Sequence, residues 1–300
     1  MSFSNEIRDE LCRIQKRRPC CELAEAYGIL AFANRFSADS IRISSEHEGF
    51  VRRAKEILFN ALGVSFDVIS GDRWKLELHD RAAISTVFSR FGYDTERHVT
   101  MHFHGWFVEE ECCMAAFLRG AFLCAGVCAD PAKSYHLELS SARGAFLREL
   151  LVRASELSFT LRISRRQNGY LLYAKESEHI EDFLTFIGAP SAAMRLMEQK
   201  VLKDYRNRIN RQSNCEFSNI RKTIDAAEAQ TVAILQLAER GLLHELPTAL
   251  KETADVRIAF PDLSLAELCE KFDPPVSKSC LNHRLRKLTA MARELDQPAE

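Results

Sequence analysis

The sequence has no apolar run of about 18 residues, so none of its 300 residues belong to a predicted transmembrane helix. Its first residues, MSFSNEIRDELCRIQKRR, carry too many charges for a signal peptide, and we expect a soluble, cytoplasmic protein. The net charge is also close to zero, because the sequence has 41 Lys and Arg residues and 42 Asp and Glu residues. A preference for a charged partner must therefore come from local charge.

The sequence also lacks the two separate C-x₂₋₄-C segments that most zinc sites use, although it has 10 cysteines. They fall as single residues, as Cys124 with Cys128, and as the adjacent pairs Cys20-Cys21 and Cys112-Cys113. Cys124 and Cys128 could be combined with the histidines at 102 and 104, but free cysteine in a reducing compartment usually behaves as a small buried hydrophobe. We expect no metal ion and no cofactor.

A long internal repeat is the strongest organisational signal. AYGILAFANRFSADSIRISS begins at Ala26, and LRGAFLCAGVCADPAKSYHLELS begins at Leu118, where its helix is predicted to stop at an Asp-Pro turn. In both copies a strand, a helix, two strands and a helix ending in glycine follow, with offsets of 92 residues at Gly28 and 96 at Trp74. Residues 8–190 therefore predict two αββαββα halves, each with a four-stranded antiparallel sheet.

Small residues mark the first helix of each half. They are Gly28, Ala31 and Ala33 in one copy, and Gly120, Ala121, Ala125 and Gly126 in the other. Glycine inside a helix costs roughly 0.5–1 kcal/mol relative to alanine, so it needs a packing reason. We expect these two helices to pack closely against each other and to form the interface between the halves.

This topology resembles that of the LAGLIDADG homing endonucleases, whose paired helices each end in an acidic metal ligand. The matching positions here hold Ala33 and Ala125, and a shift of one residue either way supplies no carboxylate. Hydrolysis of DNA with Mg²⁺ needs oxygen ligands to hold the ion. Asp39 and Asp130 are nearby, but aspartate before a strand usually bonds to its own turn. We predict that the chain is not an enzyme.

The charge changes after the repeat. Residues 195–222 include eight basic and three acidic residues, which gives a local net charge of 8 − 3 = +5. A solvated helix face can look like this, but a basic stretch before a terminal domain also suits contact with phosphates.

The end of the chain, LSLAELCEKFDPPVSKSCLNHRLRKLTAMAREL, predicts two helices. Ser264 with Glu267 forms a capping box for the first, which we expect to end near Phe272. An Asp-Pro-Pro turn follows, and Ser277 caps the second helix. The pattern predicts a helix-turn-helix.

The second of these helices has an apolar stripe at Leu281, Leu285 and Leu288, and no acid between residues 277 and 293. Arginine can bind guanine and asparagine can bind adenine in the major groove, whereas lysine and serine can reach phosphates. The DNA-binding residues that we predict are Ser277, Lys278, Ser279, Asn282, His283, Arg284, Arg286 and Lys287. A solvated basic helix in an αα-hairpin is the alternative.

Four separated segments, MSFSNEIRDEL, RGAFLCAGVCADPAKSYHLE, NCEFSNIRKTIDAA and DPPVSKSCLNHRLRKL, make the chain resemble the WhiA family. That resemblance implies an α+β fold, with a nuclease-dead LAGLIDADG-like domain and a C-terminal all-α helix-turn-helix domain. We place the halves at 1–105 and 106–192, a basic linker at 193–211 and the helix-turn-helix domain at 212–297.

The same resemblance implies a sequence-specific transcriptional regulator of bacterial cell division, chromosome segregation or sporulation. Its partners would be double-stranded DNA, in the nucleoid, and RNA polymerase or another regulator. Two alternatives remain open: a protein-binding scaffold, and an architectural chromosome-associated factor that binds DNA without sequence preference.

Overall fold

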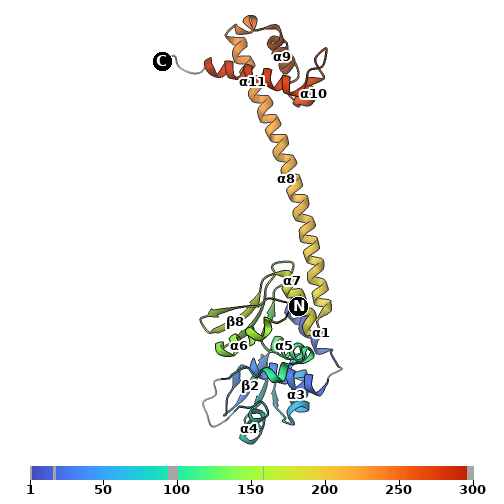
Figure 1. The fold of residues 1–300 in the computed structure, drawn as a ribbon, viewed down its shortest axis with the longest axis vertical. Helices are drawn as coiled ribbons and strands as arrows, with labels where there is room; N and C mark the ends of the chain where they lie inside the picture. The colour runs from blue at the N-terminus through green and yellow to red at the C-terminus, as the bar shows by residue number, and fades with distance from the viewer. Residues whose placement is uncertain (1, 16–17, 94–100, 158, 296–300) are drawn as a thin grey trace. The chain divides into compact units, whose positions relative to one another are not determined.

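The computed structural model describes residues 2–15, 18–93, 101–157 and 159–295. The chain folds into two compact units, Met1–Asp204 and Tyr205–Glu300 (Figure 1). A few residues of the predicted first half (94–100) and of the predicted helix-turn-helix domain (296–297) lie outside the described residues. Among the described residues, no helix has both the length and the apolar composition needed to cross a bilayer.

The first unit begins with helix α1 (Phe3–Cys12) and then repeats one order of elements twice. The first half consists of α2 (Pro19–Ala31), β1 (Arg35–Phe36), β2 (Ile41–Ser45), α3 (Glu48–Leu62), β3 (Asp67–Ile69), β4 (Trp74–Leu78) and α4 (Arg81–Arg90). The second half, after a 3₁₀ turn η1 (Gly105–Val108), consists of α5 (Glu111–Ala125), β5 (Gly126–Cys128), β6 (Leu137–Ser141), α6 (Gly144–Ala154), β7 (Arg162–Arg166), β8 (Gly169–Ala174) and α7 (Ser177–Ile187).

The two sheets have the same topology. Their strand orders are β1-β2-β4-β3 and β5-β6-β8-β7, and all pairs are antiparallel. Trp74 pairs with Ser45 in one sheet, and Tyr170 pairs with Ser141 in the other. These residues are the equivalents that the repeat predicted, so the α+β fold with two αββαββα halves is confirmed.

Helices α2 and α5 lie side by side at the centre of the first unit, and two glycines set their separation. A Cβ atom added to Gly28 would lie 2.1 Å from the carbonyl oxygen of Phe117, and one added to Gly120 would lie 2.3 Å from that of Glu25. Both neighbours are backbone atoms, which cannot rotate away. The predicted close contact of the two helices is confirmed.

The predicted end of the second interface helix is wrong. Helix α5 ends at Ala125 and does not continue to the Asp-Pro turn. Gly126 adopts an extended conformation at φ −81° and ψ 140°, and it pairs with Leu139 as the first residue of β5. From Gly126 to Cys128 the backbone pairs with strand β6 and does not form a further helical turn, so Gly126 belongs to the edge strand of a sheet.

The second unit is helical. Its elements are the end of α8 (Pro190–Glu239), a 3₁₀ turn η2 (Leu242–Glu245), α9 (Thr248–Ala259), α10 (Leu265–Cys269) and α11 (Lys278–Leu295) (Figure 1). The segment at 193–211, predicted as a linker, lies within α8 and is helical. No glycine or proline occurs between residues 191 and 240, so nothing in the sequence interrupts the helix before Gly241, which has φ 74°.

Candidate nucleic-acid interface

Helix α10 begins with the predicted capping box. The Ser264 hydroxyl accepts the backbone N–H of Glu267 at 3.4 Å, and the Glu267 carboxylate accepts the backbone N–H of Ser264 at 2.9 Å. Hydrogen bonding of the Ser264 side chain and of its backbone N–H to the Glu267 carboxylate lowers the pKa of Glu267, since it favours the charged form. The helix is shorter than predicted and ends at Cys269, not near Phe272.

The turn between α10 and α11 is fixed at both ends. Near its start, the Cys269 carbonyl accepts the backbone N–H of Val276 at 3.3 Å. At its end, the Ser277 hydroxyl accepts the backbone N–H of Cys280 at 3.3 Å, which is the predicted cap of the second helix. A short helix and a capped longer helix therefore meet at a turn of defined geometry, as a helix-turn-helix requires.

The apolar stripe of α11 is buried as predicted. Leu281, Leu285 and Leu288 are at most 1% exposed. They share a core with apolar residues of α8, α9 and α10. Because this stripe fixes the rotation of α11 about its axis, it also decides which residues reach solvent.

Seven of the eight predicted DNA-binding residues are exposed. They are Ser277, Lys278, Ser279, Asn282, His283, Arg286 and Lys287. Arg284 is the exception, since it is only partly exposed and its Nη1 atom is enclosed. At 100° per residue, Arg284 lies at the edge of the apolar stripe, not on the opposite side. We therefore remove Arg284 from the face that is available to a ligand.

The exposed residues of α11 form two parallel rows. Lys278, Asn282 and Arg286 lie on the side toward α8, where Lys278 and Arg286 border hollows that the α8 residue Gln230 also lines. Ser279, His283 and Lys287 follow one position later, so they point about 100° further round, away from the core.

A buried arginine for which the sequence predicted no role holds the loop that leads into α10. Arg257 on α9 is 1% exposed, and its Nη1 atom donates to the carbonyls of Leu263 at 2.8 Å and of Phe260 and Pro261 at 3.4 Å. Burial lowers the pKa of Arg257. The guanidinium group thus holds the loop from which the helix-turn-helix begins.

We expect Arg257→Met to destabilise the second unit by about 2 kcal/mol, because it removes charge-assisted hydrogen bonds and leaves buried carbonyls without a donor. Amide hydrogen exchange in α11 measures this local effect, and Lys251→Ala, an exposed change on the same helix, is the control. Unchanged protection in the Arg257 variant would mean that the loop does not depend on the guanidinium group.

The first unit holds the positions where the homing endonucleases carry their acids. Ala125 is the last residue of α5, whereas Ala33 lies two residues beyond the end of α2, and both line one hollow of ≈ 550 Å³ between the halves. Glu138 also lines it, but the carboxylate of Glu138 is paired with Arg166 at 3.1 Å and with His136 at 2.9 Å. Of the candidate turn aspartates, Asp130 accepts the backbone N–H of Ala132 at 3.0 Å.

Arginines cover the carbonyl groups at both of these helix ends. Arg143 donates to the carbonyl of Ala31 at 2.8 Å and to that of Ala33 at 3.4 Å. Arg8 donates to the carbonyls of Gly126 at 2.5 Å and Leu123 at 3.3 Å. Burial lowers the pKa of both guanidinium groups. Each helix C-terminus therefore has a cation beside its partial negative charge.

Cys124 and His102, which were considered and rejected as metal ligands from the sequence, have other partners in the structure. The Cys124 thiol donates to the carbonyl of Phe32 at 3.3 Å, and His102 Nδ1 lies 2.9 Å from Glu149 Oε1. Instead, the two adjacent cysteine pairs come together, and their four sulfur atoms lie within 4.8 Å of one another. This cluster was not predicted from the sequence, although the 92-residue offset of the repeat relates the pairs: 112 − 20 = 92.

Comparison with known proteins supports both units. A family described as the WhiA LAGLIDADG-like domain matches residues 114–206, and one described as the WhiA C-terminal HTH domain matches residues 209–292. A crystal structure titled full-length WhiA from Thermatoga maritima has a TM-score of 0.57 at 22% identity, and the match covers 98% of this chain and 99% of that one. That similarity shows a shared fold.

Similar sequences extend along the whole chain. A protein of Ruminiclostridium cellulolyticum named "Probable cell division protein WhiA" is 36% identical over 310 residues, covering 98% of both chains. A protein of the same name from Desulfitobacterium hafniense is 34% identical, covering all of this chain and 98% of its own. Identity at this level over the full length, with both domains matched, shows that this chain belongs to the WhiA family.

Proposed function

We propose that this chain is a sequence-specific DNA-binding regulator of transcription that does not cleave DNA. The observation that supports this most strongly is the exposed, acid-free face of α11 on a helix-turn-helix whose apolar stripe is buried. Because relatives along the whole chain are named cell division proteins, we further propose a role in cell division. Binding to chromosomal DNA would place the protein in the nucleoid.

Base reading and phosphate contact by the row of Lys278, Asn282 and Arg286 can be tested separately. Asn282→Ala or Arg286→Ala is expected to cost roughly 1–3 kcal/mol on a duplex selected from a random pool and little on random DNA. Lys278→Ala, at the first turn, should weaken both duplexes alike and reduce the slope of log K against log salt by about one. Competition binding at two salt concentrations measures both effects.

Lys251→Ala, an exposed lysine of α9, is the matched control and should leave both affinities unchanged. Equal losses on the two duplexes for Asn282→Ala and Arg286→Ala would show that α11 binds DNA without reading bases, which favours the architectural alternative. Absence of binding to any duplex at low salt would favour the protein-binding scaffold.

We also expect no Mg²⁺-dependent nicking of supercoiled plasmid. The helix ends present Ala33 and Ala125, and the guanidinium groups of Arg8 and Arg143 lie on the adjacent carbonyls. A divalent cation would meet two positive charges and no unpaired carboxylate from these helices. Nicking activity that purifies with the protein would contradict this proposal.

A further inference from the structure

The two adjacent cysteine pairs occupy equivalent places in the two halves. Cys20 and Cys21 are the second and third residues of α2, and Cys112 and Cys113 are the second and third residues of α5. The offset of 92 residues between the pairs equals the offset between Gly28 and Gly120, at which the helices touch. The parallel packing of α2 and α5 therefore brings both pairs to the same end of the interface.

The spacing of the sulfur atoms suits a single metal ion. All four lie within 4.8 Å of one another, and those of Cys20 and Cys21 are 4.0 Å apart. Four thiolates at a Zn–S bond length of about 2.3 Å form a tetrahedron with edges of about 3.8 Å. Side-chain shifts of less than about 1 Å would close the site. An iron–sulfur cluster with two irons would instead need two cysteine pairs separated by the width of the cluster.

All four cysteines lie in the first turns of α2 and α5. The first turn of a helix carries partial positive charge and stabilises a thiolate, and here two such turns meet. Zinc binds the thiolate form of cysteine, so binding of the ion would release the thiol protons.

Packing alone does not explain the cluster. Cys21 and Cys113 are buried, as small hydrophobes would be, but Cys20 and Cys112 are exposed. Two exposed cysteines gain nothing from burial, yet they complete a group of four with their buried neighbours. A closed set of four cysteines is the usual ligand set of a structural zinc site.

We propose that Cys20, Cys21, Cys112 and Cys113 bind one zinc ion that links the N-terminal ends of α2 and α5. The ion would join the two halves of the first unit at the end opposite Ala33 and Ala125. This site is independent of DNA binding by α11, and its failure would leave the proposed function unaffected.

The test uses the full chain, purified under reducing conditions and loaded with Co²⁺ or Zn²⁺. We expect one ion per chain after removal of free metal, a thiolate-to-cobalt charge-transfer band of the size given by four ligands, and a rise in the unfolding temperature on loading. In Cys20→Ser/Cys112→Ser, loss of two of the four ligands should weaken binding by about 100-fold or more and abolish the rise in unfolding temperature. The exposed pair Cys215→Ser/Cys280→Ser is the matched control and should behave as the unmodified protein.

Circular dichroism of the metal-free variants shows whether they fold, and single Cys20→Ser provides a milder change if the double variant does not. Three outcomes would overturn the proposal. The reduced, folded protein retains no metal; the Cys20→Ser/Cys112→Ser variant retains as much as the control; or mass spectrometry finds the cluster as disulfides that persist in the reducing buffer.

Discussion

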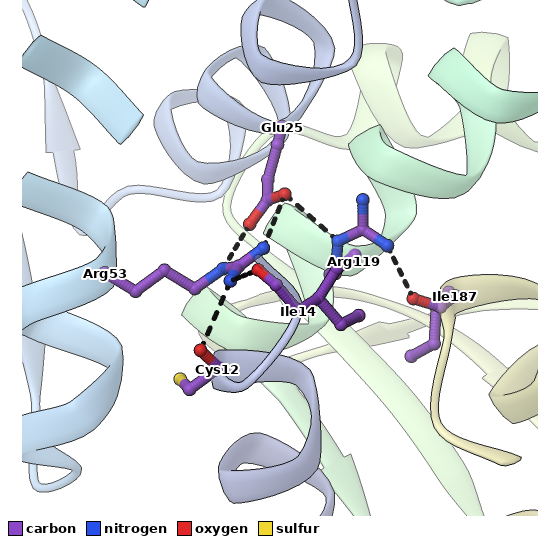
Figure 2. A network of polar contacts seen from close by, with 6 residues as sticks. All are labelled: Cys12, Ile14, Glu25, Arg53, Arg119 and Ile187. Atoms are coloured by element: carbon purple, nitrogen blue, oxygen red, sulfur yellow. Dashed lines mark hydrogen bonds and ion pairs between the residues drawn. The ribbon is translucent and has the colours of Figure 1, made fainter. Parts of the chain in front are cut away.

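Glu25→Ala is expected to lower the free energy of unfolding of the first unit by about 3–5 kcal/mol, because it leaves two buried arginines without their counter-ion. Glu25 is 1% exposed. Its carboxylate accepts from Arg53 at 2.7 and 3.0 Å and from Arg119 at 3.0 Å (Figure 2). The two guanidinium groups also donate to the carbonyls of Ile14 and Ile187, so α2, α3, α5 and the end of α7 meet at one carboxylate.

Tryptophan fluorescence during urea unfolding measures this effect selectively, because both tryptophans, Trp74 and Trp106, lie in the first unit. Glu48→Ala is the control: it breaks an exposed pair with Arg52 and should cost less than about 1 kcal/mol. A cost for Glu25→Ala as small as that of the control would show that the two guanidinium groups find other partners. Replacing all three charged residues with apolar ones should cost less than Glu25→Ala alone.

The repeat could be predicted from the sequence because each half must bury one face of a sheet under two helices. That requirement imposes the same order of strand-like (period 2) and helix-like (period 3.6) hydrophobic patterns in each half. Trp74 and Tyr170 accordingly occupy equivalent positions in the two sheets. Element ends were harder to predict. Gly126 is compatible with a helix or a strand edge, and only its pairing with Leu139 decides between them.

Buried charges could not be predicted, because they depend on partners that are distant in the sequence. Glu25 and Arg119 are separated by 94 residues, and their neighbours in sequence are ordinary helix residues. Arg257 has a different kind of partner, since it binds backbone carbonyls that every residue carries. In both cases the fold supplies the reason for burial, and local sequence does not.

The candidate site was predicted better at α11 than at the cysteines. A helix exposes residues opposite its apolar stripe, so periodicity alone identified Asn282, His283 and Lys287 as exposed. Arg284 is only partly exposed because it lies beside that stripe. The cysteine cluster was missed because each segment was expected to supply ligands two to four residues apart, whereas here each half supplies two adjacent cysteines.

Gly28→Ala is expected to destabilise the first unit by about 3 kcal/mol, at the upper end for overpacking. The new methyl group would lie 2.1 Å from the Phe117 carbonyl oxygen and 3.1 Å from the backbone nitrogen of Ala121. Since backbone atoms cannot adopt another rotamer, α2 and α5 must separate, and contacts along both helices weaken. Gly105→Ala is the control, because an added Cβ there meets no atom within 4 Å. It should change stability by less than about 0.5 kcal/mol in the same fluorescence assay.

Gly120→Ala should have a similar effect, because its methyl group would lie 2.3 Å from the Glu25 carbonyl oxygen. The two substitutions act on one separation between two helices, so they should not be additive. Once Gly28→Ala has moved the helices apart, the second methyl group finds part of its space already open. We therefore expect the double variant to be less destabilised than the sum of the single variants by about 1 kcal/mol or more. Full additivity would show that each clash is relieved locally, and that the glycines do not set the distance between the two halves.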